Sequence, residues 1–460
     1  RTPGITGQET TESNYQTLTT GTLQWNDPND WQIGSVPPTG SEVEILSDMT
    51  LDVDAEVSEI TISSGNTLTS QSGQSRTLTI QDGGSFINDG SFNANDGTVS
   101  FPGSGTITAN APTTFNDVDI AGGVNFGSGP LIDGVLTVNP GGFADTNSPI
   151  YGTASTLDFD TGGNYNIDGN TTLWTTGATL GAGVPNNVTS TSSDLTISQN
   201  RNVTGTLTVD SGASITTTGT ATLTISVNAT NNGTITTGSG NFEVSANLTN
   251  AGTFNQGGLV DVGANFINQM NNGIYTNNSD DRIIVGSNFQ NQSAASFTLS
   301  NTIGGDLEVK GNFTDNGTFT ANNRAVFFTG SSNQTVDATN PVTIDFIIID
   351  TTNGAKVQMN QDLNLPNNLE LTNGNLDLNG NTLTISGDIR PNGGNGTIEG
   401  SATNSTLIFD DSSTARTLES GDLENNEIAN LTIDESAGVT INTDLTVTEN
   451  LDINAGENFI

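Results

Sequence analysis

A four-residue motif, Val or Ile followed by two residues and then Asn, occurs five times between Ile225 and Phe319. Successive copies are separated by 19, 18, 23 and 24 residues, counted between their Asn residues, which are Asn228, Asn247, Asn265, Asn288 and Asn312. Self-similarity at a period of this size is typical of a solenoid, in which each repeat forms one coil and contacts only its neighbours. The motif therefore constrains the fold more than any other feature of the chain.

Apolar and polar residues alternate within each repeat, as in Phe242-Glu243-Val244 and Leu307-Glu308-Val309. Alternation places successive side chains on opposite faces of a strand, whereas a helix requires a period of 3.6 residues. Most copies continue with Leu or Phe, any residue, and Asn or Asp, and then reach a second strand such as Gly317-Thr318-Phe319. The sequence predicts an all-β fold, a right-handed parallel β-helix with roughly 18–24 residues per coil and roughly 22 coils.

The Asn of the motif is expected to occupy the same corner of every coil. Asn tolerates left-handed backbone conformations, and its amide can hydrogen-bond to an identical amide one coil away. We therefore predict a structural ladder formed by Asn228, Asn247, Asn265, Asn288 and Asn312.

The first fifty residues differ from the repeats. Residues 1–24 are polar and lack periodic apolar residues, which predicts an N-terminal arm. Residues 25–50 contain Trp25 and Trp31, and these are expected to cap the uncovered core of the first coil. An exposed aromatic platform for sugars is the alternative interpretation of the two tryptophans. Residues 51–460 are predicted to form the β-helix itself.

The predicted β-helix has three regions. Gly-rich loops loosen the pattern over about 100–200, regular coils follow over about 205–330, and a four-coil duplication covers about 344–453. In the duplication, segments recur at an offset of 82 to 84 residues, as Asn360-Gln361-Asp362-Leu363 with Asn442-Thr443-Asp444-Leu445, and Asn368-Leu369-Glu370-Leu371 with Asn450-Leu451-Asp452-Ile453.

Two further phrases carry a resemblance to a known group of proteins: Asn379-Gly380-Asn381-Thr382-Leu383-Thr384-Ile385 and Asn430-Leu431-Thr432-Ile433. With these repeats, the chain resembles the secreted parallel β-helix surface proteins of Gram-negative bacteria, which include large adhesins and filament proteins. The stretch from Trp25 to Ile45 is similar to the lead-in of many such proteins. The resemblance covers nearly the whole chain and implies a secreted, extracellular or cell-surface location, but its motifs are structural and specify no ligand. The chain departs from it in lacking a recognisable C-terminal sorting or anchoring domain.

Composition excludes several classes of function. The chain has no His and no Cys, which removes Ser-His-Asp and Cys-His catalysis, ordinary zinc sites and thiol chemistry. A net charge of −41 disfavours nucleic acid, whose binding needs clustered Lys and Arg, and no segment predicts membrane insertion. No cofactor is expected.

Acidic residues remain candidates for catalysis and for calcium. Asp280-Asp281-Arg282 is the best catalytic candidate, but adjacent strand residues point to opposite faces and cannot readily pair. The segment from Asn164 to Gly169 superficially matches half of an EF-hand loop and is interpreted as a turn, because Thr175 stands where the bidentate Glu belongs. Diffuse calcium binding by the acidic surface stays open.

These observations predict a non-enzymatic structural or adhesive protein of a bacterial surface, with surface glycans as a candidate partner. A polysaccharide-binding or polysaccharide-degrading β-helix is the alternative, and a passive stalk for a separate binding domain is a third. Because solenoid phrasing continues to Ile460, head-to-tail self-association into a filament is expected, unless the natural protein continues beyond this residue. The start at Arg1 suggests a cleaved precursor or a fragment.

Overall fold

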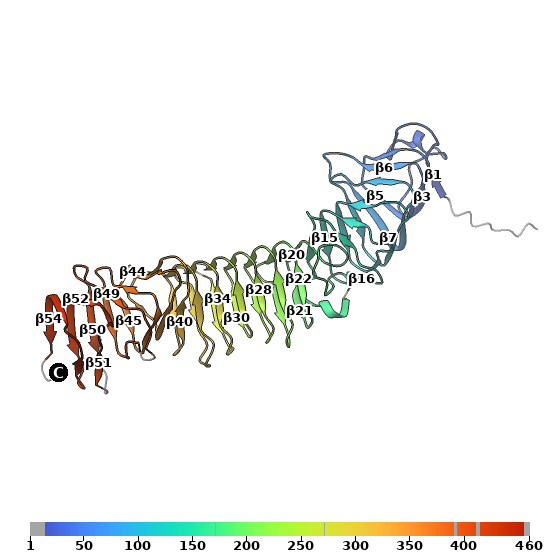
Figure 1. Ribbon diagram of the computed structural model, residues 1–460. Helices are drawn as coiled ribbons and strands as arrows, with labels where there is room; N and C mark the ends of the chain where they lie inside the picture. Colours follow the sequence, from blue (N-terminus) through green and yellow to red (C-terminus); the bar gives the residue numbers. More distant parts are fainter. Residues whose placement is uncertain (1–13, 171, 271, 391–392, 411–414, 455–460) are drawn as a thin grey trace, which may run out of the picture. The chain divides into compact units, whose positions relative to one another are not determined.

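The computed structural model describes residues 14–170, 172–270, 272–390, 393–410 and 415–454 (Figure 1). The chain is an all-β parallel solenoid of about 19 turns. The period of the regular repeats predicts roughly 22 turns. The difference arises because some turns contain long insertions, such as the one between Phe159 and Asn187. The right hand of the helix stays a prediction.

The chain divides into two compact units, which are described separately. Unit 1 comprises residues 1–196 and 201–205, and unit 2 comprises residues 197–200 and 206–460.

Unit 1 contains two parallel sheets. The larger contains β1 (Asn14–Gln16), β3 (Ser41–Ile45), β5 (Ala55–Ile62), β7 (Thr77–Asn88), β9 (Thr98–Phe101), β10 (Gly105–Ala109), β12 (Asp117–Ile120), β13 (Gly123–Asn125), β15 (Val135–Val138), β16 (Phe143–Ala144), β18 (Thr156–Phe159) and β20 (Asn187–Ser190). The second contains β2 (Leu23–Gln24), β4 (Met49–Leu51), β6 (Thr67–Ser70), β8 (Ser91–Asn93), β11 (Thr114–Phe115), β14 (Leu131–Ile132) and β17 (Ile150–Tyr151). The remaining elements up to residue 205 are η1 (Pro28–Asp30), β19 (Asn164–Asn166), η2 (Ile167–Asn170), β21 (Asp194–Ile197) and β22 (Arg201–Val203).

The solenoid begins earlier than the sequence predicts. Residues 14–24, assigned to the polar arm, include β1 and β2, which pair in parallel with β3 and β4. The prediction was wrong for this part of the arm because backbone hydrogen bonds to the next coil hold polar strands that carry little apolar signal. Residues 1–13 lie outside the described residues.

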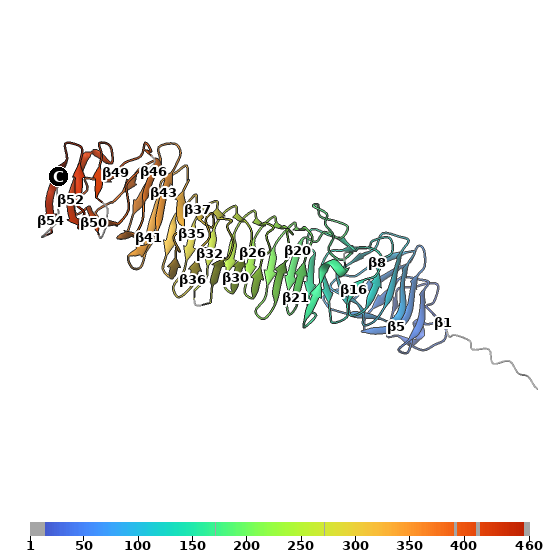
Figure 2. The ribbon, with the colours of Figure 1, turned by 90° about the horizontal axis from the view of Figure 1, so that it is seen from below.

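The regular coils of unit 2 each contribute one strand to each of three parallel sheets, and successive coils lie side by side in both views (Figures 1 and 2). Sheet one contains β23 (Leu207–Val209), β26 (Ala229–Asn231), β29 (Leu248–Asn250), β32 (Phe266–Asn268), β35 (Phe289–Asn291) and β38 (Phe313–Asp315). Sheet two contains β24 (Ser214–Thr217), β27 (Thr234–Thr236), β30 (Thr253–Gln256), β33 (Ile274–Asn277), β36 (Ser296–Thr298) and β39 (Thr318–Thr320). Sheet three contains β25 (Leu223–Ile225), β28 (Phe242–Val244), β31 (Val260–Val262), β34 (Ile283–Val285), β37 (Leu307–Val309), β40 (Ala325–Phe328), β43 (Phe346–Asp350) and β46 (Leu369–Asn373).

The last coils continue sheet one. Its further strands are β41 (Gln334–Ala338), β42 (Val342–Thr343), β44 (Val357–Met359), β45 (Leu363–Leu365), β47 (Leu376–Asp377), β48 (Thr382–Ile385), β49 (Ile398–Gly400), β50 (Thr406–Asp410), β52 (Leu423–Asp434) and β54 (Thr446–Ile453), while β51 (Arg416–Leu418) and β53 (Val439–Ile441) form a separate pair. Segments that are equivalent in the predicted duplication lie on different sheets: β46 belongs to sheet three, whereas Leu451 and Ile453 pair with Leu431 and Ile433 in sheet one. Similar sequence therefore does not give the same position in the coil here.

Alternation builds the core, as the sequence predicts. In β28, Phe242 and Val244 are buried and Glu243 faces outward, and the same pattern recurs in successive coils. In sheet one, the rings of Phe266, Phe289 and Phe313 stack from coil to coil, with centroid separations of 5.6 and 5.1 Å. Each coil thereby covers the apolar side chains of the coil before it.

Candidate functional site

The five predicted Asn residues occupy one corner of unit 2, between a strand of sheet three and the next strand of sheet one. Asn247 donates from Nδ2 to Asn228 Oδ1 at 3.0 Å, and Asn265 donates in the same way to Asn247 at 2.9 Å. The next two steps use the backbone instead: the N–H groups of Asn288 and Asn312 donate to the preceding side-chain Oδ1 atoms at 3.2 and 2.9 Å. The residues therefore form one continuous outer ladder, in register.

A second ladder, which the sequence reasoning missed, lies inside the solenoid. Its members are the last residues of consecutive strands of sheet one, and each donates from Nδ2 to the side chain in the next coil, at 2.8, 2.8, 2.9 and 2.7 Å: Asn231, Asn250, Asn268, Asn291 and Asp315. All five side chains are buried. The signal was present as the Asn or Asp that follows Leu or Phe in each repeat, but the pattern alone did not show that these side chains turn inward.

The inner ladder satisfies most of its buried polar atoms. Asn231, Asn250 and Asn291 each donate a further bond from Nδ2 to a backbone carbonyl, those of Thr253, Ile274 and Thr318 respectively. At the first coil, Asn231 Oδ1 has no hydrogen-bond partner among the described residues. At the last coil, burial raises the pKa of Asp315 above the ordinary value of an aspartate.

The two N-terminal tryptophans are buried. Trp25 and Trp31 are 2% and 1% exposed, and their rings meet edge to face with centroids 5.1 Å apart. Trp31 Nε1 donates to the carbonyl of Trp25 at 2.9 Å. The alternative of an aromatic platform for sugars was wrong for these residues because neither ring face is open. Their action as a cap stays a prediction.

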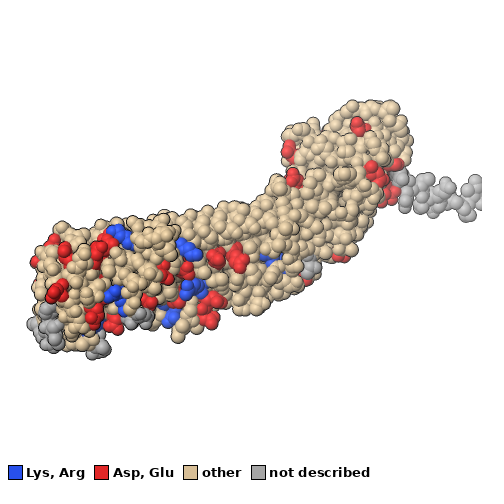
Figure 3. All heavy atoms as spheres, viewed as in Figure 1, with Lys and Arg blue, Asp and Glu red and all other residues tan. Residues whose placement is uncertain are grey.

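The outward side chains of sheet three form a row that mixes acidic and apolar residues: Thr224, Glu243, Asp261, Ile284, Glu308, Phe327, Ile348 and Glu370. A shallow cavity of about 200 Å³ lies along Thr224, Glu243 and Asp261. Figure 3 shows acidic and basic side chains interspersed over the later coils of unit 2. This row is the strongest candidate for a polar binding surface in the sense of the polysaccharide alternative.

One acidic and one basic residue meet in this row. Arg282 donates from Nη1 to Glu308 at 2.9 Å and lies 4.5 Å from the centre of the Phe327 ring, while Lys310 Nζ is 4.0 Å from the same carboxylate. Glu308 also accepts the hydroxyl of Thr329 at 2.9 Å. The carboxylate of Glu308 is thus engaged by its neighbours, as in a structural ion pair.

The two acidic motifs of the sequence have structural roles. Asp280 and Asp281 lie in an exposed turn, in which the Asp281 carbonyl accepts bonds from Asn277 and Gln256. The segment that resembles half of an EF-hand loop forms β19 and η2, and its Asp168 pairs with the buried Arg201 at 2.6 Å. The interpretation of this segment as a turn is confirmed.

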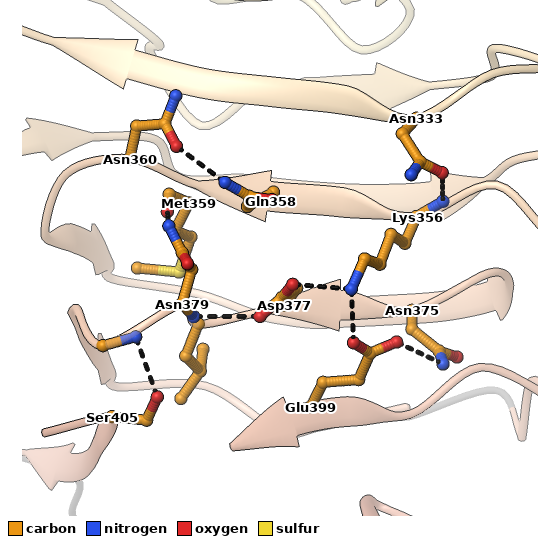
Figure 4. A network of polar contacts seen from close by, with 12 residues as sticks. Asn333, Lys356, Gln358, Met359, Asn360, Asn375, Asp377, Asn379, Glu399 and Ser405 are labelled. Atoms are coloured by element: carbon orange, nitrogen blue, oxygen red, sulfur yellow. Dashed lines mark hydrogen bonds and ion pairs between the residues drawn. The ribbon is translucent and has the colours of Figure 1, made fainter. Parts of the chain in front are cut away.

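A network of polar contacts crosses three coils near the C-terminal end of sheet one (Figure 4). Lys356 Nζ lies between Asp377 and Glu399 at 2.7 and 2.8 Å, and Asn375 Nδ2 donates to the other oxygen of Glu399 at 3.0 Å. The two carboxylates are directly opposite each other on β47 and β49. The ammonium group reduces their mutual repulsion, and these contacts raise the pKa of Lys356 above its ordinary value.

Two further ion pairs in the last coils are more deeply buried. Arg416 lies 3.2 Å from Glu435, with side chains 2% and 0% exposed, and it also donates to the carbonyls of Ile385 and Ser386. Arg390 donates from Nε to Asp422 at 2.7 Å. Both pairs connect segments more than a coil apart.

Comparison of the chain with protein-family models, curated proteins and solved structures returned no match. Within the described part of the chain, no group of three or more Asp, Glu, His or Cys side chains could hold a metal ion. No helix among these residues is long and apolar enough to cross a membrane.

Proposed function

We propose that the chain is a non-enzymatic structural and adhesive protein that acts outside the cell, at a bacterial surface. The observation that supports this most is the pair of amide ladders, which join five consecutive coils of unit 2 along a corner and through the core. Hydrogen bonds between coils oppose their separation, and buried polar networks with satisfied partners rigidify a core. A stack of this kind suits a spacer or scaffold, and the resemblance to surface adhesins supports the location.

A filament is the finer form of this proposal. On β54, Leu451 and Ile453 continue inward columns that are fully buried in the preceding coils at Leu431 and Ile433, yet they are 44% and 42% exposed. A second copy that stacks its first coils on β54 would cover them and pair the open strand edge. Such a head-to-tail contact is heterologous and propagates when it does not close.

Sedimentation and electron microscopy of the purified chain test assembly. We expect concentration-dependent linear oligomers for the wild type and mainly single particles for a Leu451→Lys, Ile453→Lys variant. The matched control is Ile303→Lys, because Ile303 is 84% exposed and far from β54 in the coil sequence. Single particles at every concentration of the wild type would rule out the filament.

A polysaccharide-binding or polysaccharide-degrading protein is the second candidate, and the outer row of sheet three favours it. Carboxylates on adjacent coils at Glu243 and Asp261, beside a shallow cavity, are groups that a glycan-cleaving site uses. Incubation with acidic and neutral polysaccharides distinguishes the proposals. We expect retention at most, without new reducing ends or unsaturated products. Release of products that is lost in Asp261→Asn would replace the structural proposal by the enzymatic one.

A further inference from the structure

The outer face of sheet two carries a regular array of hydroxyl groups. Each strand from β24 to β39 presents two outward residues, separated by one inward residue, and consecutive strands pair without a register shift. All these positions are Thr or Ser except Asn255 and Ile274: Ser214, Thr216, Thr234, Thr236, Thr253, Thr276, Ser296, Thr298, Thr318 and Thr320. We call these twelve positions the threonine face; β30 and β36 are labelled along it in Figure 2.

The core behind the threonine face keeps it regular. The inward residues of its last four strands are aromatic, and their rings stack in parallel: Phe254, Tyr275, Phe297 and Phe319, with centroid separations of 5.2, 4.5 and 5.8 Å. Tyr275 is further fixed by a hydrogen bond from its hydroxyl to Gln256 at 2.5 Å. A rigid backing holds the outward side chains on a fixed grid, so little conformational freedom remains to be lost on binding.

The dimensions of this grid follow from strand geometry. Neighbouring parallel strands lie about 4.8 Å apart, and two outward residues of one strand are separated by about 6.6 Å. Thr is β-branched, so its hydroxyl and methyl groups are restricted in rotation at each grid point. The result is a two-dimensional repeat of polar and apolar groups that extends over six coils.

The chemistry of the threonine face is unusual for this chain. The chain has a net charge of −41, yet none of the twelve positions is Asp, Glu, Lys or Arg. An ionic ligand therefore finds no partner there, and with no aromatic residue among the outward positions the face offers no ring on which a sugar could stack. The ligand that it fits is uncharged and periodic in two dimensions.

We infer that the threonine face binds the surface of ice. Its two repeats are close to the spacings of water oxygens on the prism faces of hexagonal ice. Water held by the hydroxyls, and restrained between the methyl groups, takes positions close to those of the lattice, so the protein joins the crystal through an ordered water layer. This inference does not depend on the structural and adhesive role proposed above, because it concerns one face and one ligand.

Ice affinity of the full chain tests the inference. Protein is mixed with slowly growing ice, and the fraction incorporated is compared with the fraction in the liquid, while the melting and freezing points are read by nanolitre osmometry. We expect the wild type to enter the ice and to shape the crystals. Thr298→Tyr places a ring in the middle of the grid and should reduce incorporation severalfold.

Thr249→Tyr is the matched control. Thr249 is also a half-exposed, outward Thr, but it lies on β29 in sheet one, and its substitution should leave incorporation unchanged. If Thr298→Tyr does not fold, as judged by circular dichroism, Thr236→Tyr on β27 takes its place. Exclusion of the wild type from ice, or an equal loss in Thr249→Tyr, would overturn the inference. Retention on crystalline cellulose or chitin without incorporation into ice would overturn it in favour of a polysaccharide surface.

Discussion

Asn291 donates its side-chain amide to the carboxylate of Asp315 at 2.7 Å, so a ladder of buried amides ends on a carboxylate. Asp315 also accepts the backbone N–H of Gly317 at 3.2 Å. The residue beside Asp315 in the next coil is Ala338, whose side chain accepts no hydrogen bond. A group that only accepts therefore suits this end of the ladder, since an Asn there would direct an unused N–H toward Ala338.

The titration of Asp315 should appear in the stability of the protein. Burial raises its pKa in the folded state, so folding favours the protonated form. Its contribution to the free energy of unfolding is therefore greatest below the ordinary pKa of an aspartate and falls as pH rises through the raised value. Asp315→Asn should remove this decline, seen as a difference in thermal unfolding between variant and wild type that changes with pH. The exposed Asp337, substituted in the same way, is the control, and an equal effect there would contradict the assignment.

Interruption of the inner ladder should cost more in the middle than at its start. Asn268→Leu removes the donor to Asn291 Oδ1 and to two backbone carbonyls, which leaves buried acceptors unsatisfied at about 1–3 kcal/mol each. Asn231→Leu also removes one donor, but it eliminates an oxygen that already lacks a partner. Chemical denaturation should therefore give a larger loss for Asn268→Leu. Equal losses would show that the ladder does not act through its hydrogen bonds.

The buried pair of Arg416 and Glu435 should be far more sensitive to the loss of one partner than to the loss of both. Arg416→Leu leaves a buried carboxylate without its cation, which costs about 3–5 kcal/mol. The double variant Arg416→Leu, Glu435→Leu should recover most of that loss, because no uncompensated charge remains. A thermodynamic cycle of the four proteins, measured by urea unfolding, gives the coupling. Additive losses would mean that the pair does not interact across the coils.

Lys356 should contribute modestly and in a way that depends on salt. Its ammonium group contacts both Asp377 and Glu399, but its side chain is 32% exposed, so Lys356→Met should cost less than about 1 kcal/mol. The raised pKa means that this contribution is complete below the ordinary pKa of lysine and is lost only as pH rises through the raised value. Unfolding at low and high ionic strength should show the difference shrinking with salt. A difference that is independent of salt would indicate a packing effect of the lysine stem.

Calcium should stabilise the protein gradually. With 50 acidic and nine basic residues, cations screen repulsion over the whole surface. Calorimetry should show a smooth increase of the unfolding temperature with calcium concentration, and magnesium should act similarly. A sharp, saturating transition specific for calcium would contradict diffuse binding and indicate a dedicated site.

The sequence by itself determined which residues repeat and which face inward along each strand. Alternation such as that of Phe242 and Val244 has a period of two, and only a strand places such residues on one face. The recurrence of Asn228 and Asn247 at nearly constant intervals also fixed the register of the outer ladder, because equal spacing puts equal residues at equal corners.

Only the tertiary structure decided which residues meet across coils where the spacing varies. Asn250 and Asn268 turn into the core because the chain bends immediately after them, and a strand pattern does not specify the direction of a bend. Lys356 reaches Glu399 over 43 residues, a contact that depends on the lengths of the intervening loops. The same dependence places Leu369 and Leu451 on different sheets although their surroundings in sequence are alike. Local alternation sets the face of a side chain, whereas loop length and packing set its neighbours, and these become definite only when the coils are stacked.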